Sequence, residues 1–140
     1  MQFYMYDFSS FVSLDVTENG LFPPYLQLDT YWQEDKTRFS YIIQKDDKYI
    51  GFALVRLIAT EEKHHYSMAE FFILRRYRRE GLGTAIAKQI FNLHQGQWEV
   101  FQKESNEPAQ VFWKKVINEY SSGNFTERFE DGKRIQIFNS

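Results

Sequence analysis

The feature that most constrains the fold is an apolar strand that runs through an arginine-rich turn with two glycines into a helical pattern. Phe71–Leu74 is apolar at every position, which is typical of a central strand covered on both faces. Over 82–94 the apolar residues recur at helical spacing, which predicts an amphipathic helix. A buried strand joined so closely to a helix indicates an α/β layer fold.

The other segments extend this pattern to the whole chain, which we interpret as one domain over 1–140 with an α+β layered architecture. Asn106 is the expected N-cap of a late helix, and Pro108 fits its first turn. The expected elements are short helices around Phe3–Phe11 and Tyr25–Trp32, a hairpin over 38–57, a polar connection holding His64 and His65, a strand over Met68–Leu74, a strand over Trp98–Phe101, a helix over Ala109–Tyr120, and a terminal hairpin over 125–138.

Charge and composition exclude several functional classes. Seventeen Lys and Arg against nineteen Asp and Glu give a net charge of −2, which argues against a nucleic-acid partner. The absence of cysteine excludes disulfides, thiolate metal sites and a cysteine nucleophile, and favours a reducing compartment. There is no basic, apolar leader at the N-terminus and no apolar run of about 18 residues. We therefore expect a cytoplasmic chain without a membrane partner.

The turn over 75–84 has the composition of an anion cradle. Gly81 and Gly83 lack a Cβ, so their backbone N–H groups can approach a phosphate at the start of the following helix. Arg78 and Arg79 add positive charge. Two alternatives stay open: a tight turn in which glycine relieves strain and the arginines are solvated, or a small nucleic-acid patch.

The turn does not fit two common phosphate motifs. A P-loop needs Gly-Lys-Ser/Thr, which is missing here. A dinucleotide fold needs a third glycine and an acidic residue at the end of a second parallel strand, and neither is evident.

The spacing Arg78-x-x-Gly81-x-Gly83 resembles the acyl-CoA pyrophosphate motif of the GNAT N-acetyltransferase superfamily. Asn106-x-x-Ala109, which opens the next predicted helix, is similar to a second segment of that superfamily. The resemblance covers roughly 38–140. Three shorter segments resemble a bacterial subgroup of acetyltransferases with unassigned substrates: Tyr6-Asp7-Phe8-Ser9, Glu70-Phe71-Phe72 and Phe112-Trp113.

The resemblance implies a mostly antiparallel mixed sheet with helices on both faces and acetyl-CoA as co-substrate. Its central parallel strands, 68–74 and 98–102, would splay apart and leave backbone groups of Phe72, Ile73 and Leu74 for the pantetheine amides. The other residues implied to contact the cofactor are Arg78, Arg79, Glu80, Gly81, Leu82, Gly83, Thr84, Asn106, Ala109 and Trp113. One departure is that no strand precedes the first helix, so the sheet would lack an edge strand.

Glu70 is the predicted general base, because it is the one carboxylate in an otherwise apolar strand and desolvation would raise its pKa. The alternative is a glutamate at the strand entrance that remains in water. His64 and His65 are weaker candidates for a proton relay. Together with His94 their spacing does not form a metal site, so no metal is expected.

Trp113 stands where many members of that superfamily carry the tyrosine that protonates the CoA thiolate. Indole is not a practical acid near neutral pH, so we interpret Trp113 as core or cleft wall. Solvent or another hydroxyl, such as that of Tyr120, would then supply the proton. By resemblance the acceptor side holds Asp7 and four tyrosines, which are otherwise core residues: Tyr4, Tyr6, Tyr25 and Tyr31.

The sequence thus predicts an acetyltransferase that moves the acetyl group of acetyl-CoA directly to a primary amine, with a small molecule or a peptide as the acceptor. Two alternatives remain: a CoA-binding or interaction module without turnover, and an α/β domain for another phosphate ligand. A homodimer is left open.

Overall fold

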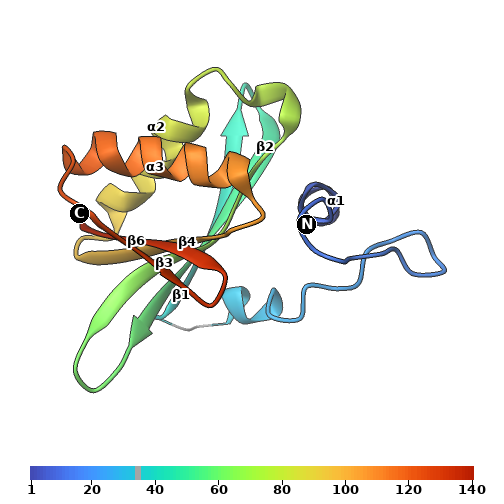
Figure 1. Ribbon diagram of the computed structural model, residues 1–140. Helices are drawn as coiled ribbons and strands as arrows, with labels where there is room; N and C mark the ends of the chain where they lie inside the picture. Colours follow the sequence, from blue (N-terminus) through green and yellow to red (C-terminus); the bar gives the residue numbers. More distant parts are fainter. Residues whose placement is uncertain (34–35) are drawn as a thin grey trace.

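The computed structural model describes residues 1–33 and 36–140 and consists of a six-stranded sheet with helices on both faces (Figure 1). The helical elements are α1 (Gln2–Phe8), the 3-10 turn η1 (Asp29–Trp32), the 3-10 turn η2 (Arg75–Tyr77), α2 (Leu82–Leu93) and α3 (Glu107–Ser121). The strands are β1 (Arg38–Lys45), β2 (Lys48–Ala59), β3 (His64–Ile73), β4 (Gln97–Lys103), β5 (Thr126–Glu130) and β6 (Lys133–Asn139). The strand order is β1-β2-β3-β4-β6-β5, with only β3 and β4 parallel. The predicted mixed, mostly antiparallel sheet is confirmed.

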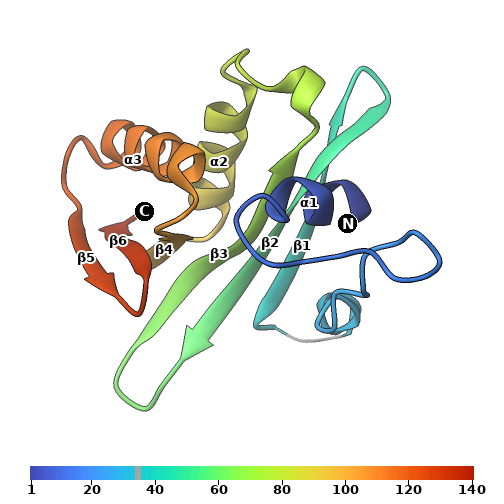
Figure 2. The same ribbon diagram turned by 45° about the vertical axis from the view of Figure 1, so that its right-hand side comes forward.

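Two different layers cover the sheet. Helices α2 and α3 lie together on one face, and α1 lies on the other with the segment that follows it (Figures 1 and 2). The main core fills the space under α2 and α3, where Phe91 and Trp98 are fully buried with their ring centroids 4.8 Å apart. On the opposite face Tyr4 packs edge-on against Phe52 and Phe72. The sheet therefore separates a large apolar core from a smaller aromatic layer.

Both predicted hairpins are present and close through two-residue turns. Asp46 and Asp47 have φ values of 49° and 59°, and Asp131 and Gly132 have 50° and 68°. Two consecutive positive φ values match the turn twist that antiparallel strands require, and Asp and Gly adopt them at low cost.

The two parallel strands separate in the middle of the sheet. β3 pairs with β4 only at Tyr66–Trp98 and Ser67–Glu99, although both strands continue beyond these pairs. Against β2, the register slips between Leu54–Glu70 and Val55–Met68, so Ala69 is an extra residue in β3. A β-bulge bends its strand and redirects nearby side chains. The predicted splay is thus confirmed, and the bulge lies where the strands part.

Some boundaries differ from those predicted. The strand expected to start at Met68 begins at His64, because Ala59 and His64 already pair across β2 and β3; the two histidines are therefore in a strand and not in a connection. The first helix ends at Phe8, and the second predicted helix is reduced to η1. No strand precedes α1 in the described part of the chain. None of the helices described is long and apolar enough to cross a membrane.

Candidate active site

The turn between β3 and α2 presents unsatisfied backbone donors. Gly81 is the N-cap of α2 with φ 74°, and no side chain of the described residues caps this helix end. Arg79 also has a positive φ, 70°, which is uncommon for a side-chain-bearing residue and marks local strain. When residues with positive φ alternate with residues with negative φ, their successive backbone N–H groups point toward one position and can bind an anion there. The positive end of the helix dipole strengthens this attraction.

Glycine is needed at positions 81 and 83 of this turn for different structural reasons. A Cβ on Gly81 would meet no atom within 4 Å, whereas a Cβ on Gly83 would lie 3.2 Å from the Phe112 ring and 3.4 Å from Ile73 Cδ1. Gly83 therefore lets α2 pack closely on α3 and β3. At position 81 glycine is needed because the backbone has a positive φ. No other atom lies close to the position of a Cβ on Gly81, so this part of the turn is accessible from outside.

Arg78 is directed away from the turn toward α1. Its Nε donates to the Ile73 carbonyl at 2.7 Å, and its Nη2 forms an ion pair with Asp7. Arg75 Nη2 contacts the other oxygen of the same carboxylate at 2.9 Å. The Arg78 guanidinium also lies 5.5 Å from the Phe72 ring centroid. Asp7 thus holds two of the arginines that precede the turn.

Beyond the bulge, one side of β3 has no neighbouring strand. Leu74 donates its N–H to the Ile50 carbonyl at 2.7 Å. Because backbone groups of an antiparallel strand alternate in direction, Phe72 also faces β2, and Ile73 directs its N–H and C=O toward the opening. Of the three residues predicted to pair with pantetheine, Ile73 is the one turned to the opening.

Glu70 lies beside the bulge on the face covered by α1. Tyr25 Oη donates to its Oε1 at 2.8 Å, and Tyr4 Oη donates to its Oε2. Burial raises the pKa of Glu70, and the two hydroxyls and the charge of Arg56 oppose that rise. Burial and the Glu70 charge raise the pKa of both tyrosines, so they remain donors. Glu70 is half-buried in mid-strand and does not lie at a solvated strand entrance.

The sequence over residues 7–117 matches the model of the acetyltransferase (GNAT) family. This span includes the turn, Glu70 and the start of α3. The chain belongs to the GNAT family. No curated protein matches the sequence.

Several solved structures share this fold at low sequence identity. An acetyltransferase from Thermus thermophilus has a TM-score of 0.61 and 16% identity, over 82% of this chain and 71% of that one. A protein from Streptococcus mutans has a TM-score of 0.63 and 16% identity, over 84% and 78%. The ribosomal-protein-S18-alanine N-acetyltransferase from Escherichia coli has a TM-score of 0.59 and 14% identity, over 84% and 78%.

The second GNAT segment has the predicted local geometry. Asn106 Oδ1 accepts from the Ala109 N–H at 3.2 Å, and Pro108 lies in the first turn of α3. About one turn after Ala109, Phe112 and Trp113 pack on Phe71 with ring centroids 5.7 and 5.2 Å away. Trp113 is 6% exposed, which supports the core interpretation. The start of α3 therefore flanks the opening next to β3.

The remaining candidates are engaged elsewhere. Tyr120 donates to Asn92 Oδ1 at 2.7 Å, at the end of α2 remote from Gly81. His94 is buried against Tyr41, and His65 lies 3.8 Å from the Glu99 carboxylate. In the described ranges, His, Asp and Glu side chains form no group of three or more that could hold a metal ion.

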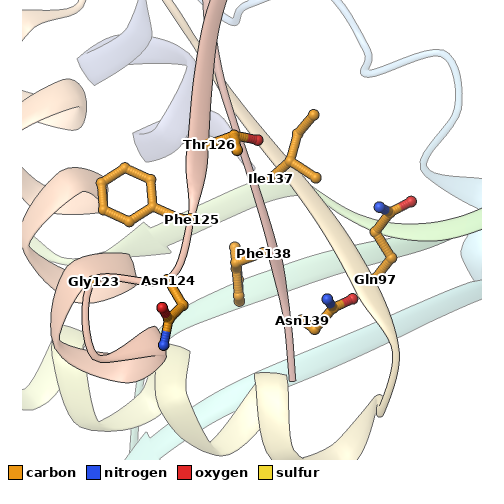
Figure 3. A pocket seen from close by; sticks show the side chains of 8 residues that line it. All are labelled: Gln97, Gly123, Asn124, Phe125, Thr126, Ile137, Phe138 and Asn139. Atoms are coloured by element: carbon orange, nitrogen blue, oxygen red, sulfur yellow. The ribbon is translucent and has the colours of Figure 1, made fainter.

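Two surface cavities flank the sheet at different places. One of about 640 Å³ lies between α1 and the β1–β2–β3 face and is lined by Phe52, Phe72 and Leu74 among others. The other, of about 460 Å³, lies near the C-terminus between the end of α3 and strands β4, β5 and β6 (Figure 3). The predicted site residues Phe72 and Leu74 line the first cavity, and none lines the second.

Sequence reasoning missed Arg56 and the pairing of Asp7 with Arg75 and Arg78. Arg56 is the single charged residue within the apolar run Gly51–Ile58. The same argument that selected Glu70 would have selected it. The Asp7 pairs have no such signal, because nothing local relates residues so far apart. The sequence indicates only acceptor-side or core roles for Tyr4, Tyr25 and Tyr31, and it gives no signal for the hydrogen bonds of Tyr4 and Tyr25 to Glu70.

Proposed function

We propose that this GNAT protein transfers the acetyl group of acetyl-CoA directly to a primary amine, with Glu70 as the general base. The observation that carries the proposal is the position of Glu70, a half-buried carboxyl at the bulge where β3 and β4 part. A carboxyl with a raised pKa is suited to accept a proton from an ammonium group near neutral pH.

Three features fit acetyl-CoA at the opening. The start of α2 carries free backbone donors for a pyrophosphate, Ile73 has backbone groups turned to the opening, and Asn106 and Ala109 start the helix that flanks it. The proposed contacts comprise Phe72, Ile73, Leu74, Arg78, Arg79, Glu80, Gly81, Leu82, Gly83, Thr84, Asn106, Ala109 and Trp113. When bound, acetyl-CoA supplies the thioester that a neutral amine attacks.

The residues of the chain prepare the amine. Glu70 takes the proton of the ammonium group, directly or through one water. Tyr4 and Tyr25 hold the carboxyl in place through their hydroxyls. Trp113 contributes packing, so the proton for the leaving thiolate comes from solvent or another hydroxyl. No covalent enzyme intermediate is needed, in agreement with the absence of cysteine.

The printed names of two structural neighbours give a range of acceptors. The Escherichia coli neighbour acts on an alanine of a ribosomal protein, and a metagenomic aminoglycoside acetyltransferase was solved with sisomicin. These two names describe a peptide amine and a small-molecule amine. Both classes of amine should therefore be tested as acceptors.

The test is transfer from acetyl-CoA to a panel of amines, followed by release of the CoA thiol and by mass of the product. Because the chain has no cysteine, a thiol reagent gives no signal from the protein. Glu70→Gln should lower kcat about 100-fold or more and leave acetyl-CoA affinity nearly unchanged. Glu62→Gln, an exposed glutamate in the β2–β3 connection, is the matched control and should retain full activity.

Other outcomes would select an alternative. Acetyl-CoA binding without transfer to any amine would indicate a CoA-binding or interaction module. Equal affinity for CoA and free nucleotides would indicate a domain for another phosphate ligand. Full activity of Glu70→Gln would place the base elsewhere.

A further inference from the structure

Arg56 lies on the same face of the sheet as Glu70. It stands on β2 opposite Ser67 of β3 and Arg38 of β1. Leu54, two residues before Arg56, is directly opposite Glu70. Side chains two apart on a strand, and directly opposite across strands, share one face. The charge of Arg56 acts on Glu70, where it lowers the pKa against the effect of burial.

Arg56 has a buried hydrogen-bond donor without a partner. Its Nε is fully shielded from solvent and finds no acceptor among residues 1–33 and 36–140. A buried donor left unpaired carries its full desolvation cost, so native proteins almost always pair such groups with protein, water or ligand. Guanidinium groups bind carboxylates and phosphates through paired N–H donors.

A second arginine and aromatic rings lie near Arg56. Arg38 lies beside it on β1, with its guanidinium 5.5 Å from the ring centroid of Tyr31. Burial raises the pKa of Tyr31, and the charges of Arg56 and Arg38 oppose that rise. Tyr25 donates a hydrogen bond to Glu70, and the charge of Arg56 lowers the pKa of Tyr25 against the effect of burial. The Glu70 carboxyl group and the Arg56 guanidinium group therefore belong to one face of the sheet, and the segment that follows α1 crosses this face (Figure 2).

We propose that the acceptor carries an anionic group, carboxylate or phosphate, a few bonds from its amine, and that Arg56 binds this group while the amine meets Glu70. The proposal rests on the proposed function and goes further by naming the substrate class. An acceptor with both charges would satisfy Arg56 and Glu70 at once. An amine without an anionic group would leave the Arg56 donor unpaired.

The first experiment compares matched acceptors that differ only in the anionic group. Glycine is paired with methylamine, β-alanine with ethylamine, and phosphoethanolamine with ethanolamine. For the wild type we expect kcat/KM to be on the order of 10- to 100-fold higher for the anionic member of at least one pair, as for a hydrogen bond to a charged group. The carboxylate and phosphate pairs distinguish the two anions. Equal kcat/KM within every pair would overturn the proposal.

The second experiment removes the charge. Arg56→Met should reduce the preference to within about 3-fold of unity, and Arg56→Lys should retain part of it. Because the Arg56 charge also lowers the pKa of Glu70, the test compares the ratio of kcat/KM for the two amines of a pair within each variant, which a change at Glu70 affects equally. The control is Arg128→Met, because Arg128 lies on β5 at the far edge of the sheet; this variant should keep the wild-type preference. An unchanged preference in Arg56→Met would refute the assignment.

A binding measurement separates this inference from the proposed function. Calorimetry compares N-acetylglycine with N-methylacetamide, neither of which requires turnover. Selective binding of N-acetylglycine that Arg56→Met abolishes supports the anion site even if no amine is acetylated, in which case the proposed function alone fails. Transfer to amines with equal kcat/KM for acceptors with and without an anionic group would leave the proposed function intact and overturn the inference. Circular dichroism of Arg56→Met and Arg56→Lys checks that both variants are folded.

Discussion

Asp7 of α1 forms an ion pair with Arg78, 71 residues later in the chain, and Arg78 at the same time donates to the Ile73 carbonyl at 2.7 Å. The Ile73 carbonyl faces the opening between β3 and β4. The pair therefore links the N-terminal helix to the turn where we propose the pyrophosphate binds. A bound pyrophosphate would compete with Asp7 for Arg78 and Arg75.

Asp7→Asn should raise acetyl-CoA affinity about 2- to 5-fold, because it removes the anion that competes for the two arginines. The size follows from partly exposed ion pairs, which contribute at most about 1 kcal/mol. Calorimetric titration of acetyl-CoA measures the effect. Asp15→Asn makes the same change in net charge at an exposed position and should leave the affinity unchanged. Weaker binding by Asp7→Asn would show that Asp7 supports the cradle instead of competing with it.

Gly81→Val should weaken acetyl-CoA binding at least ~5-fold, because a branched side chain blocks the approach of phosphate to the turn. Gly132→Val is a closely matched control. Gly132 has φ 68° against 74° for Gly81, and a Cβ at either site meets nothing within 4 Å. Both variants should lose similar stability, on the order of 1–2 kcal/mol for a left-handed backbone. Equal acetyl-CoA affinity in the two variants would show that this turn does not bind the cofactor.

The pH dependence of stability should report the partial desolvation of Glu70. Burial raises its pKa in the folded protein, so the folded state holds this proton at a pH where the unfolded state has released it. Stability from this group is present below the unfolded value of 4.5 and is lost as pH rises through the folded pKa. Glu70→Gln should therefore gain free energy of unfolding relative to wild type between pH 4 and pH 8 in urea titrations. A constant difference would mean that Glu70 is solvated.

His94 should affect the pH dependence of stability in the opposite direction to Glu70. Its Nε2 lies 2.6 Å from Tyr41 Oη, and burial lowers its pKa below 6.5. Below pH 6.5 the unfolded chain binds a proton that the folded state resists, so stability falls as pH decreases toward the folded pKa. His94→Gln should reduce the loss of stability between pH 7 and pH 5, measured by urea unfolding. The wild-type slope in His94→Gln would contradict the desolvation of His94.

Trp113→Phe should keep kcat within about 3-fold and lower the melting temperature, because Trp113 is buried against Phe71, Phe91 and Phe112 and its loss removes packing. Trp113→Tyr places a phenol where the resemblance expects an acid and should be at least as active as Trp113→Phe. Trp32→Phe is the exposed control, since Trp32 is 63% exposed. A 100-fold fall in kcat of Trp113→Phe without a change in melting temperature would give the indole N–H a role in the chemistry.

The sequence alone determined the elements that depend on local pattern. The helix that became α2 follows from apolar spacing, and the start of α3 from Asn106, whose side chain caps the Ala109 N–H. Both hairpins follow from alternating strands around short polar turns. The glycine turn was identifiable because its backbone conformation depends on the residues it contains. Glu70 was recognisable because one carboxylate in an apolar strand must be either solvated or paired.

Only the tertiary structure decided what surrounds these residues. Tyr25 and Tyr4 reach Glu70 across 45 and 66 residues of chain, and Asp7 reaches Arg78 across 71. No spacing in the sequence encodes such contacts, because they arise when α1 and the segment after it fold over one face of the sheet. The start of β3 at His64 has the same origin, since pairing with Ala59 of β2 outweighs the polar character of the residues. Local sequence fixes turns and periodic faces, whereas the packing of distant segments sets the charge and hydrogen bonding around Glu70 and Arg56.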